Sequence, residues 1–238
     1  MLCVNINFRY IFDKMRLFSK KKKTEDSMRT ALHRANTSWG IQPDFVIDIG
    51  AASGHWSRMC AEVWPSAHYS LVEPLEEQRA VLEKLCGERE WRYLQAVVGG
   101  NTGEIDFAVT ADLDGSGVYD DGTFTTRKMP MLPLDSLLPI AGTGLLKLDT
   151  HGYEVPIFEG SVGLLDQVEL IVVEVYGHKI SKNCLCFDSL SRYLDERGFR
   201  VAAMVDVMNR PLDGTFWQAD FLFLKCSHPV FKSTKWDS

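Results

Sequence analysis

The sequence predicts a doubly wound α/β fold, in which helices cover both faces of a mostly parallel sheet. From about Pro43 onward, short apolar segments alternate with amphipathic segments of helical periodicity. Short connections join these segments, and no internal repeat is present. Apolar strands that alternate with amphipathic helices are typical of a parallel sheet that is buried on both faces.

The first half of this region is expected to contain three strands and two helices. Residues 44–50 are an apolar segment that ends at a glycine, as expected of a buried strand before a tight turn. Residues 55–63 place apolar side chains at positions i, i+3, i+4 and i+7, which predicts a helix. The other elements expected here are strands over residues 67–73 and 91–98 and a helix over residues 76–85 that ends at Gly87.

A turn and a long loop precede the second half of the alternation. Residues 104–109 alternate like an additional antiparallel strand, and residues 111–127 form an exposed loop rich in Asp, Gly and Thr. This loop is longer than a connection requires. It is therefore either a functional segment, such as a binding loop or lid, or a flexible insertion. The remaining expected elements are strands over residues 145–149, 168–176, 199–205 and 221–225 and helices over residues 155–165 and 190–197.

Residues 1–40 lack this alternation, and we expect them to form a basic N-terminal arm that precedes one domain over residues 41–238. Residues 1–30 contain eight Lys or Arg and three Asp or Glu, whereas the remainder contains 18 and 29. A basic run such as Lys20–Lys23 is usually a solvated linker, and the alternative is contact with an anionic membrane surface or partner. Polar residues interrupt the apolar start of the arm, which argues against a signal peptide.

Composition and charge argue against several classes of protein. The 238 residues carry a net charge of −6 with a pI near 5.5, whereas general nucleic-acid binders need a basic face. No apolar run approaches the ~20 residues needed to cross a bilayer, so no integral membrane segment is expected. The spacing of the six cysteines predicts free thiols in a reducing cytoplasm. No Asp/His cluster has the spacing of metal ligands, so we expect catalysis without a metal.

A turn of small residues after the first expected strand marks the candidate cofactor site. Gly50, Ala51 and Gly54 allow a ligand to approach the backbone closely, at the carboxyl end of a strand where such sheets bind ligands. Glu73 ends the next strand, where a carboxylate can accept hydrogen bonds from both hydroxyls of a ribose. Dinucleotides and S-adenosylmethionine both contain such a ribose.

The form of the turn favours S-adenosylmethionine. Dinucleotide sites use the pattern G-x-G-x-x-G, whereas this turn is G-x-x-x-G and follows Asp48. A carboxylate at this position would repel a pyrophosphate but suits a cationic sulfonium and amino group. In the alternative interpretation, Asp48 only caps the turn. Ala96 and Val97 are expected to form an apolar wall for the adenine, whereas the default role of such strand residues is in the core.

Charged residues near the ends of two later strands mark a second candidate site. Lys147 and Asp149 lie two residues apart on one strand, so their side chains share a face. Glu174 lies within the next apolar strand, where a charge is costly unless it is paired or used. Lys147 therefore either forms a structural ion pair with Asp149 or Glu174, or contacts a substrate. Asp149 and Glu154 are stronger functional candidates, because they lie at the strand end and in the loop beyond it.

Several motifs between residues 45 and 176 form a recognisable set. The most particular is Lys-x-Asp-x-x-Gly-x-Glu, which starts at Lys147 and runs into a segment ending at Gly160, before the strand with Glu174. The others are VIDIGA at residues 46–51, VEP at 72–74, a turn ending at Gly103, PLDSLL at 133–138, FEG at 158–160 and VEV at 173–175. In these motifs the sequence resembles the FkbM family of S-adenosylmethionine-dependent methyltransferases. His151 departs from the family pattern, in which an acidic or amide residue is more usual.

This resemblance implies a Rossmann-like class I methyltransferase with a seven-stranded sheet and S-adenosylmethionine as cofactor. It also implies methyl transfer to a hydroxyl oxygen of a sugar, a glycan or a glycosylated or polyketide-like small molecule. An alcohol must lose its proton as it attacks, so a base is required. Asp149 is the first candidate for the base, and His151 is the second because its unperturbed pKa lies near 6.5. Glu154 and Glu174 would orient groups through hydrogen bonds.

Two other functions are compatible with the sequence. One is an NAD(P)-dependent oxidoreductase, which needs the same carboxylate for its ribose. The other is a non-catalytic S-adenosylmethionine-binding module that uses residues 111–127 to engage a partner.

Overall fold

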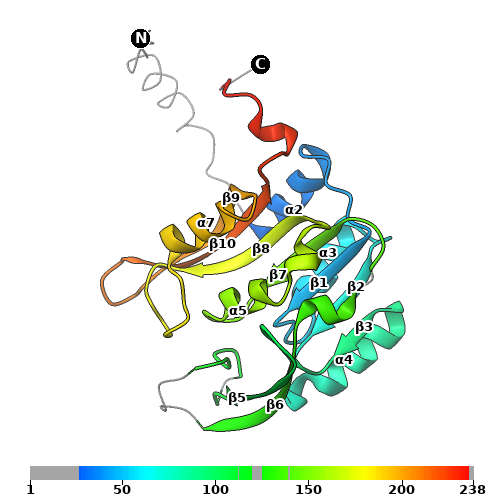
Figure 1. Ribbon diagram of the computed structural model, residues 1–238, viewed down its shortest axis with the longest axis vertical. Coiled ribbons are helices and arrows are strands. Elements are labelled where there is room, and N and C mark those ends of the chain that lie inside the picture. The colour runs from blue at the N-terminus through cyan, green and yellow to red at the C-terminus, as the bar shows by residue number, and fades with distance from the viewer. Residues whose placement is uncertain (1–26, 112, 120–124, 139, 236–238) are drawn as a thin grey trace.

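The central feature of the structure is a seven-stranded sheet with helices on both faces (Figure 1). The computed structural model describes residues 27–111, 113–119, 125–138 and 140–235. From one edge to the other, the strands are β3 (Arg92–Leu94), β2 (His68–Val72), β1 (Phe45–Ile49), β7 (Gly144–Leu148), β8 (Val168–Tyr176), β10 (Phe216–Lys225) and β9 (Phe199–Asn209). β10 alone runs against the other strands. The predicted doubly wound, mostly parallel sheet is therefore confirmed.

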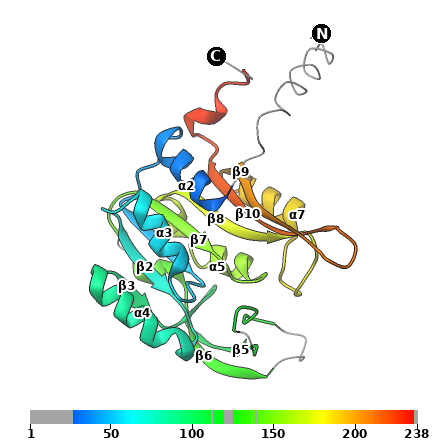
Figure 2. The same cartoon turned by 180° about the vertical axis from the view of Figure 1, so that it is seen from behind.

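Two hydrophobic layers separate this sheet from its helices. The helices are α2 (Met28–Thr37), α3 (His55–Val63), α4 (Glu76–Arg89), α5 (Glu154–Glu159), α6 (Val162–Leu165) and α7 (Phe187–Asp195), with short 3-10 helices η1 (Leu134–Leu137) and η2 (Pro229–Phe231). One layer contains buried residues of α2, α3 and α4, and the other contains those of α5, α6 and α7. Val46 and Ile47 of β1 belong to different layers, because successive strand residues face opposite sides. Figure 2 shows α2 and α3 together over one face.

Helix α2 extends the packed structure into residues 1–40, the segment in which no alternation of strands and helices was predicted. Its residues Ala31, Leu32 and Ala35 are fully buried in the layer that contains α3. Ser27 caps the helix, because its side chain accepts a hydrogen bond from the backbone N–H of Thr30. Residues 1–26, which include the basic run Lys20–Lys23, lie outside the described residues.

A second, three-stranded sheet branches from the first after β3. Its strands are, in order, β4 (Val97–Val98), β6 (Thr126–Leu132) and β5 (Gly103–Ala108). The prediction of one strand over residues 91–98 is wrong, because the chain leaves the large sheet after Leu94 and pairs again with β6 from Val97. The expected antiparallel strand near residues 104–109 is confirmed as β5. An ion pair between Glu77 of α4 and Arg127 of β6 links the small sheet to the main body.

Other elements differ from the sequence expectations mainly at their ends. Helix α4 does not stop at Gly87 but continues to Arg89, and Glu90 with φ 57° follows it. The single helix expected over residues 155–165 is two short helices that flank Gly160. A Cβ at Gly160 would lie 2.1 Å from the carbonyl oxygen of Gly99, so glycine is required at this break. Part of the loop expected over residues 111–127 is ordered by a bridge between Ala108 and Gly117.

Two further features of the described residues concern apolar helices and cysteines. No helix among them is both long and apolar enough to cross a bilayer. Their cysteines are free thiols, namely Cys60, Cys86, Cys184, Cys186 and Cys226. Cys3 lies outside the described residues.

Candidate functional site

The carboxyl ends of β1, β2, β7 and β8 border a cavity of about 460 Å³, which we call the main cavity. Of the candidate residues from the sequence, those lining it are Gly50, Glu73, Ala96, Val97, Asp149, His151 and Glu174. The candidates outside its wall are Asp48, Ala51, Gly54, Lys147 and Glu154. The small sheet contributes Phe107, and the segment after β5 contributes Ser116 and Val118. The two candidate sites therefore share one cavity.

The turn after β1 brings the backbones of two strands into close contact. Gly50 has φ +75°, and a Cβ there would lie 2.1 Å from the carbonyl oxygen of Asp149. Only glycine permits both this conformation and this approach. Gly54 (φ +73°) serves packing instead, because its Cβ would lie 2.4 Å from Leu85 of α4. Ala51 is buried within the turn. Ala51 and Gly54 therefore support the turn by packing and do not line the main cavity.

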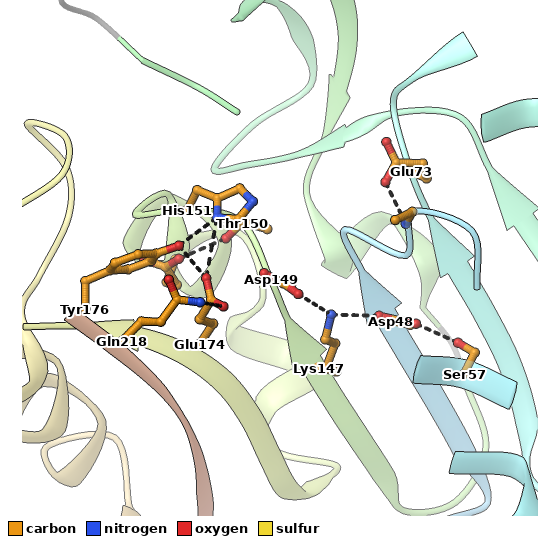
Figure 3. A network of polar contacts seen from close by, with 12 residues as sticks. Asp48, Ser57, Glu73, Lys147, Asp149, Thr150, His151, Glu174, Tyr176 and Gln218 are labelled. Carbon is orange, nitrogen blue, oxygen red and sulfur yellow. Dashed lines mark hydrogen bonds and ion pairs between the residues drawn. The ribbon is translucent and has the colours of Figure 1, made fainter. Parts of the chain in front are cut away.

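Glu73 joins the end of β2 to this turn. One of its carboxylate oxygens accepts a hydrogen bond from the backbone N–H of Ala52 at 2.9 Å (Figure 3). The other accepts a hydrogen bond from the backbone N–H of Leu75 at 3.0 Å. Burial raises the pKa of Glu73, whereas these two hydrogen bonds lower it. Each oxygen has a second lone pair, so the carboxylate can hold the turn and still accept hydrogen bonds from a ligand in the main cavity.

A buried ion-pair network lies beneath the turn (Figure 3). The Lys147 ammonium is 3.5 Å from Asp48 Oδ1 and 3.0 Å from Asp149 Oδ2, and Ser57 donates a hydrogen bond to Asp48 at 2.6 Å. Burial raises the pKa of Asp48 more than Lys147 lowers it. Burial also favours neutral Asp149, but the adjacent Lys147 holds its pKa below the usual range. Lys147 thus occupies the position of a structural ion pair, which was one of the two roles that its sequence position suggested.

A hydrogen-bonded cluster occupies the other end of the main cavity, above β8 and β10. His151 adopts φ 52° and Gly152 φ 92°, and this turn directs the imidazole toward β8 (Figure 3). Its Nδ1 lies 2.8 Å from Tyr176 Oη and 3.4 Å from Glu174 Oε1. Glu174 also accepts hydrogen bonds from the Tyr176 hydroxyl and the Gln218 amide. The imidazole therefore contacts a carboxylate that is itself fixed on both oxygens.

The electrostatic surroundings of this cluster favour a positively charged imidazole. Burial would lower the pKa of His151, but its interaction with Glu174 and the charge of Asp149 raise it to about 9. Burial and the charge of Glu174 raise the pKa of Tyr176, so its hydroxyl stays protonated. The side-chain donor atoms of Asp149, His151 and Glu174 lie within 4.8 Å of one another and could together hold a metal ion. In the structure, Lys147 donates a hydrogen bond to Asp149, and the Tyr176 hydroxyl is hydrogen-bonded to both His151 and Glu174.

Glu154 supports the turn that carries His151. Its carboxylate accepts hydrogen bonds from the Gly152 backbone N–H at 2.9 Å and from the Thr150 hydroxyl at 3.1 Å. Burial raises its pKa. The groups that Glu154 orients are therefore the Gly152 backbone and the Thr150 side chain.

A second cavity of about 490 Å³ meets the main cavity at Asp149, which lines both. It lies between the start of α2, helix α3 and the strands β9 and β10, and its wall includes Ser27, Arg29, His55, Trp56, Lys147, Asp206 and Asp220. Burial, followed by the charge of Asp149, raises the pKa of Asp220 to about 7. Among the described residues, neither a hydrogen-bond donor for the Asp220 carboxylate nor an acceptor for the Trp56 indole N–H is present. This second cavity has more negative than positive charge.

Comparison with protein families identifies the chain. A family model described as the methyltransferase FkbM domain matches residues 48–201, more than half of the sequence. The chain belongs to the FkbM methyltransferase family. Residues 48–201 thus form a methyltransferase domain of this family. The dinucleotide-dependent oxidoreductase considered from the sequence is not supported. A comparison with curated proteins gives no match.

Solved structures of other methyltransferases share the fold of this FkbM methyltransferase. A methyltransferase FkbM from Methylobacillus flagellatus KT is 14% identical with a TM-score of 0.51, covering 80% of this chain and 47% of that one. The chain thus spans about half the length of that relative. An S-adenosylmethionine-dependent methyltransferase from Clostridium acetobutylicum is 9% identical with a TM-score of 0.50, covering 92% and 97%. Magnesium protoporphyrin IX methyltransferase from Synechocystis, solved with bound S-adenosylmethionine, is 11% identical with a TM-score of 0.50, covering 93% and 86%.

Three residues of the FkbM methyltransferase that were not predicted from the sequence lie in the cavity walls or bind a wall residue. Tyr176 and Gln218 bind Glu174 in the main cavity, and Asp220 lines the second. Tyr176 lies two residues after Glu174 on the same strand, so its position on the same face was available as a signal. Gln218 and Asp220 gave no signal in isolation, because their places depend on how β10 pairs with β8.

Proposed function

We propose that this FkbM methyltransferase transfers the methyl group of S-adenosylmethionine to a hydroxyl oxygen of a small molecule or glycan. The observation that carries this proposal is the continuity of the main cavity from Glu73 and the Gly50 turn, past Asp149, to the His151–Glu174 pair. One end offers groups suited to a nucleoside, and the other offers groups that can orient a hydroxyl and accept its proton.

Residues at the first end fit the nucleoside part of the donor. Ala96 and Val97 provide an apolar wall, and Glu73 can accept hydrogen bonds from ribose hydroxyls. Gly50 has no side chain, so a ligand can contact the backbone there. When bound, S-adenosylmethionine supplies an electrophilic methyl group on a cationic sulfur. The ionised Asp149 carboxylate favours positive charge beside it.

The second cavity fits the amino-acid end of the donor. Asp220, which accepts no hydrogen bond from the described residues, and the neighbouring Asp206 suit an ammonium group, and Lys147 is already shared by two aspartates. The Trp56 indole N–H, which lacks an acceptor among the described residues, suits a carboxylate. Because both cavities meet at Asp149, one extended donor can occupy both.

Replacing Glu73 with glutamine is expected to weaken binding of S-adenosylhomocysteine by about 1–3 kcal/mol, the effect of a lost charged hydrogen bond. The loss should disappear for an analogue without the two ribose hydroxyls, because only the diol contacts the carboxylate. Calorimetry on both ligands measures this difference. The exposed Glu88→Gln variant serves as control. Equal losses for both ligands would mean that Glu73 acts only by holding the turn.

Replacing Asp220 with asparagine is expected to lower the affinity for S-adenosylhomocysteine about tenfold, or about 1.4 kcal/mol. The affinity for 5′-methylthioadenosine, which has the same nucleoside but no amino-acid end, should not change. Calorimetry above pH 7, where the Asp220 carboxylate is ionised, measures both. An equal effect on both ligands would place the amino-acid end elsewhere.

The reaction itself is tested with donor labelled in the methyl group and a panel of sugars, glycosides and polyketide-like alcohols. A labelled methyl ether supports the proposal. Label transferred only to nitrogen, carbon or nucleic acid would refute hydroxyl specificity. Donor binding with no transfer to any class would favour the non-catalytic module.

A further inference from the structure

The two candidates for the general base, Asp149 and His151, both line the main cavity. We infer that His151 is the general base, that Asp149 is not, and that Tyr176 is a positioning residue that keeps a proton on Nδ1 of His151. This inference rests on the proposed hydroxyl methyl transfer and names the residues that would perform its proton transfer.

Asp149 is poorly suited to take a proton. Its Oδ2 lies 3.0 Å from the Lys147 ammonium, which is itself buried and 3.5 Å from Asp48. Protonation of Asp149 would leave this ammonium with a weaker counter-charge in a region that excludes water, which is unfavourable. Asp149 is also the residue at which the two cavities meet. Its position suits electrostatic stabilisation of a cationic donor.

A count of the available protons determines which nitrogen of His151 carries one. The Tyr176 hydroxyl has one proton, which it donates to Glu174 Oε1. The Gln218 amide donates to the other oxygen of Glu174. Tyr176 Oη must therefore accept from His151 Nδ1, 2.8 Å away. This assigns the proton of the neutral imidazole to Nδ1 and leaves Nε2 with its lone pair.

Nε2, the other ring nitrogen, faces away from Tyr176 and Glu174. Figure 3 shows it on the side of the ring opposite Tyr176, and His151 lines the main cavity. The Asp114 backbone carbonyl stands near the ring and favours the imidazolium, so it can stabilise the proton after transfer. Asp114 also lines the main cavity, in the segment that the sequence indicated as a loop.

The charges around His151 make it a strong base once it is neutral. The groups that face it are the carboxylates Asp149, Glu154 and Glu174, the Tyr176 hydroxyl and the Asp114 carbonyl. Burial lowers the pKa of His151, but Glu174, Asp149 and the Asp114 carbonyl raise it to about 9, so the neutral form accumulates as the pH rises through 9. A cationic ligand beside Asp149 should lower this pKa.

The proton transfer that we propose is balanced without any further reactant. The acceptor oxygen forms the new bond to the methyl carbon while its O–H proton passes to Nε2 of His151. The electron pair of the broken carbon–sulfur bond remains on sulfur. The products are a methyl ether, a neutral thioether and an imidazolium, which returns its Nε2 proton to solvent after release.

The assignment is tested first without an acceptor. Protein labelled with ¹⁵N in its six histidines is studied by NMR above pH 9 in complex with S-adenosylhomocysteine, and His151→Gln identifies the signals of His151. We expect the Nδ1–H form, and its pKa should be lower in complex with sinefungin, which carries an additional amine. An Nε2–H form in the unmodified protein would overturn the inference. Failure to bind S-adenosylhomocysteine would instead refute the proposed function and leave the tautomer measurable.

The positioning role of Tyr176 needs a matched pair of variants. Tyr176→Phe removes the hydroxyl that bridges His151 and Glu174, so both tautomers should appear and the pKa of His151 should change. Tyr193→Phe removes a buried hydroxyl that has no partner among the described residues, and it should leave His151 unchanged. An unchanged tautomer in Tyr176→Phe would remove Tyr176 from the proposal.

Kinetics with an acceptor from the panel separate the two candidate bases. His151→Gln should lower kcat about 10²–10⁴-fold, the contribution of a positioned base, with little change in the donor KM. Tyr176→Phe should show a smaller loss and a shifted pH profile. Asp149→Asn should raise the donor KM. A loss confined to kcat in Asp149→Asn, together with full activity in His151→Gln, would make Asp149 the base.

Discussion

Replacing Lys147 with methionine is expected to destabilise the protein by about 3–5 kcal/mol, the typical penalty for removing one partner of a buried ion pair. The side chain is 5% exposed, and its ammonium is shared by Asp48 and Asp149. Without it, two carboxylates face each other in a region shielded from water. Urea unfolding, followed by circular dichroism at pH 7, measures the change.

Two further measurements separate the effect of charge from that of packing. Lys84→Met removes an exposed lysine and should change stability little. The deficit of Lys147→Met should shrink as the pH falls below about 4, because the depressed pKa of Asp149 stabilises the native protein only while the carboxylate is ionised. A deficit below about 1 kcal/mol at neutral pH would mean that this network is not as tightly paired as its distances indicate.

Replacing Gly50 with alanine is expected to destabilise the fold by about 2–5 kcal/mol and to abolish donor binding. A left-handed backbone costs a residue with a Cβ about 1–2 kcal/mol, and overpacking adds about 1–3 kcal/mol. The overpacked atom is the carbonyl oxygen of Asp149, 2.1 Å from the new Cβ, and a backbone oxygen cannot rotate away. The ends of β1 and β7 would have to separate. Thermal unfolding and calorimetry with S-adenosylhomocysteine measure the two effects.

Gly40 provides the control for this prediction. It has nearly the same backbone angle, φ +72°, but no atom lies within 4 Å of the position of its Cβ. Gly40→Ala should therefore show only the backbone cost of about 1–2 kcal/mol and should retain donor binding. Equal destabilisation by the two variants would indicate that the close approach at Gly50 is relieved by a small shift of β7.

The sequence predicted those elements whose hydrophobic pattern is local. The expected helix over residues 55–63 and the expected strand over residues 168–176 match α3 and β8 at both ends, because apolar periodicity marks them completely. Helix α2 was missed even though Met28, Ala31, Leu32 and Ala35 have helical spacing. Two of these four buried residues are alanines, which contribute little to a hydrophobicity pattern, and a lysine run precedes them.

The sequence located the candidate site but not its hydrogen bonds. Asp48, Glu73 and Asp149 were placed near the correct strand ends because the carboxyl ends of parallel strands meet at one edge. The partners of Glu174 follow from the register in which Gln218 pairs with Tyr176 across antiparallel strands. That register depends on the β9–β10 hairpin, which contains several irregularities, and no local pattern encodes it.

A hydrogen bond between α2 and β9 has a consequence for truncated forms of the protein. The Met28 backbone N–H binds the Asp206 carboxylate at 3.0 Å, and Ser27 and Arg29 line the second cavity. Trimming the chain up to residue 30 would delete part of that wall and free Asp206. An affinity tag is therefore best fused ahead of Ser27 with a spacer, and a trimmed enzyme should be checked for cofactor retention before its turnover is interpreted.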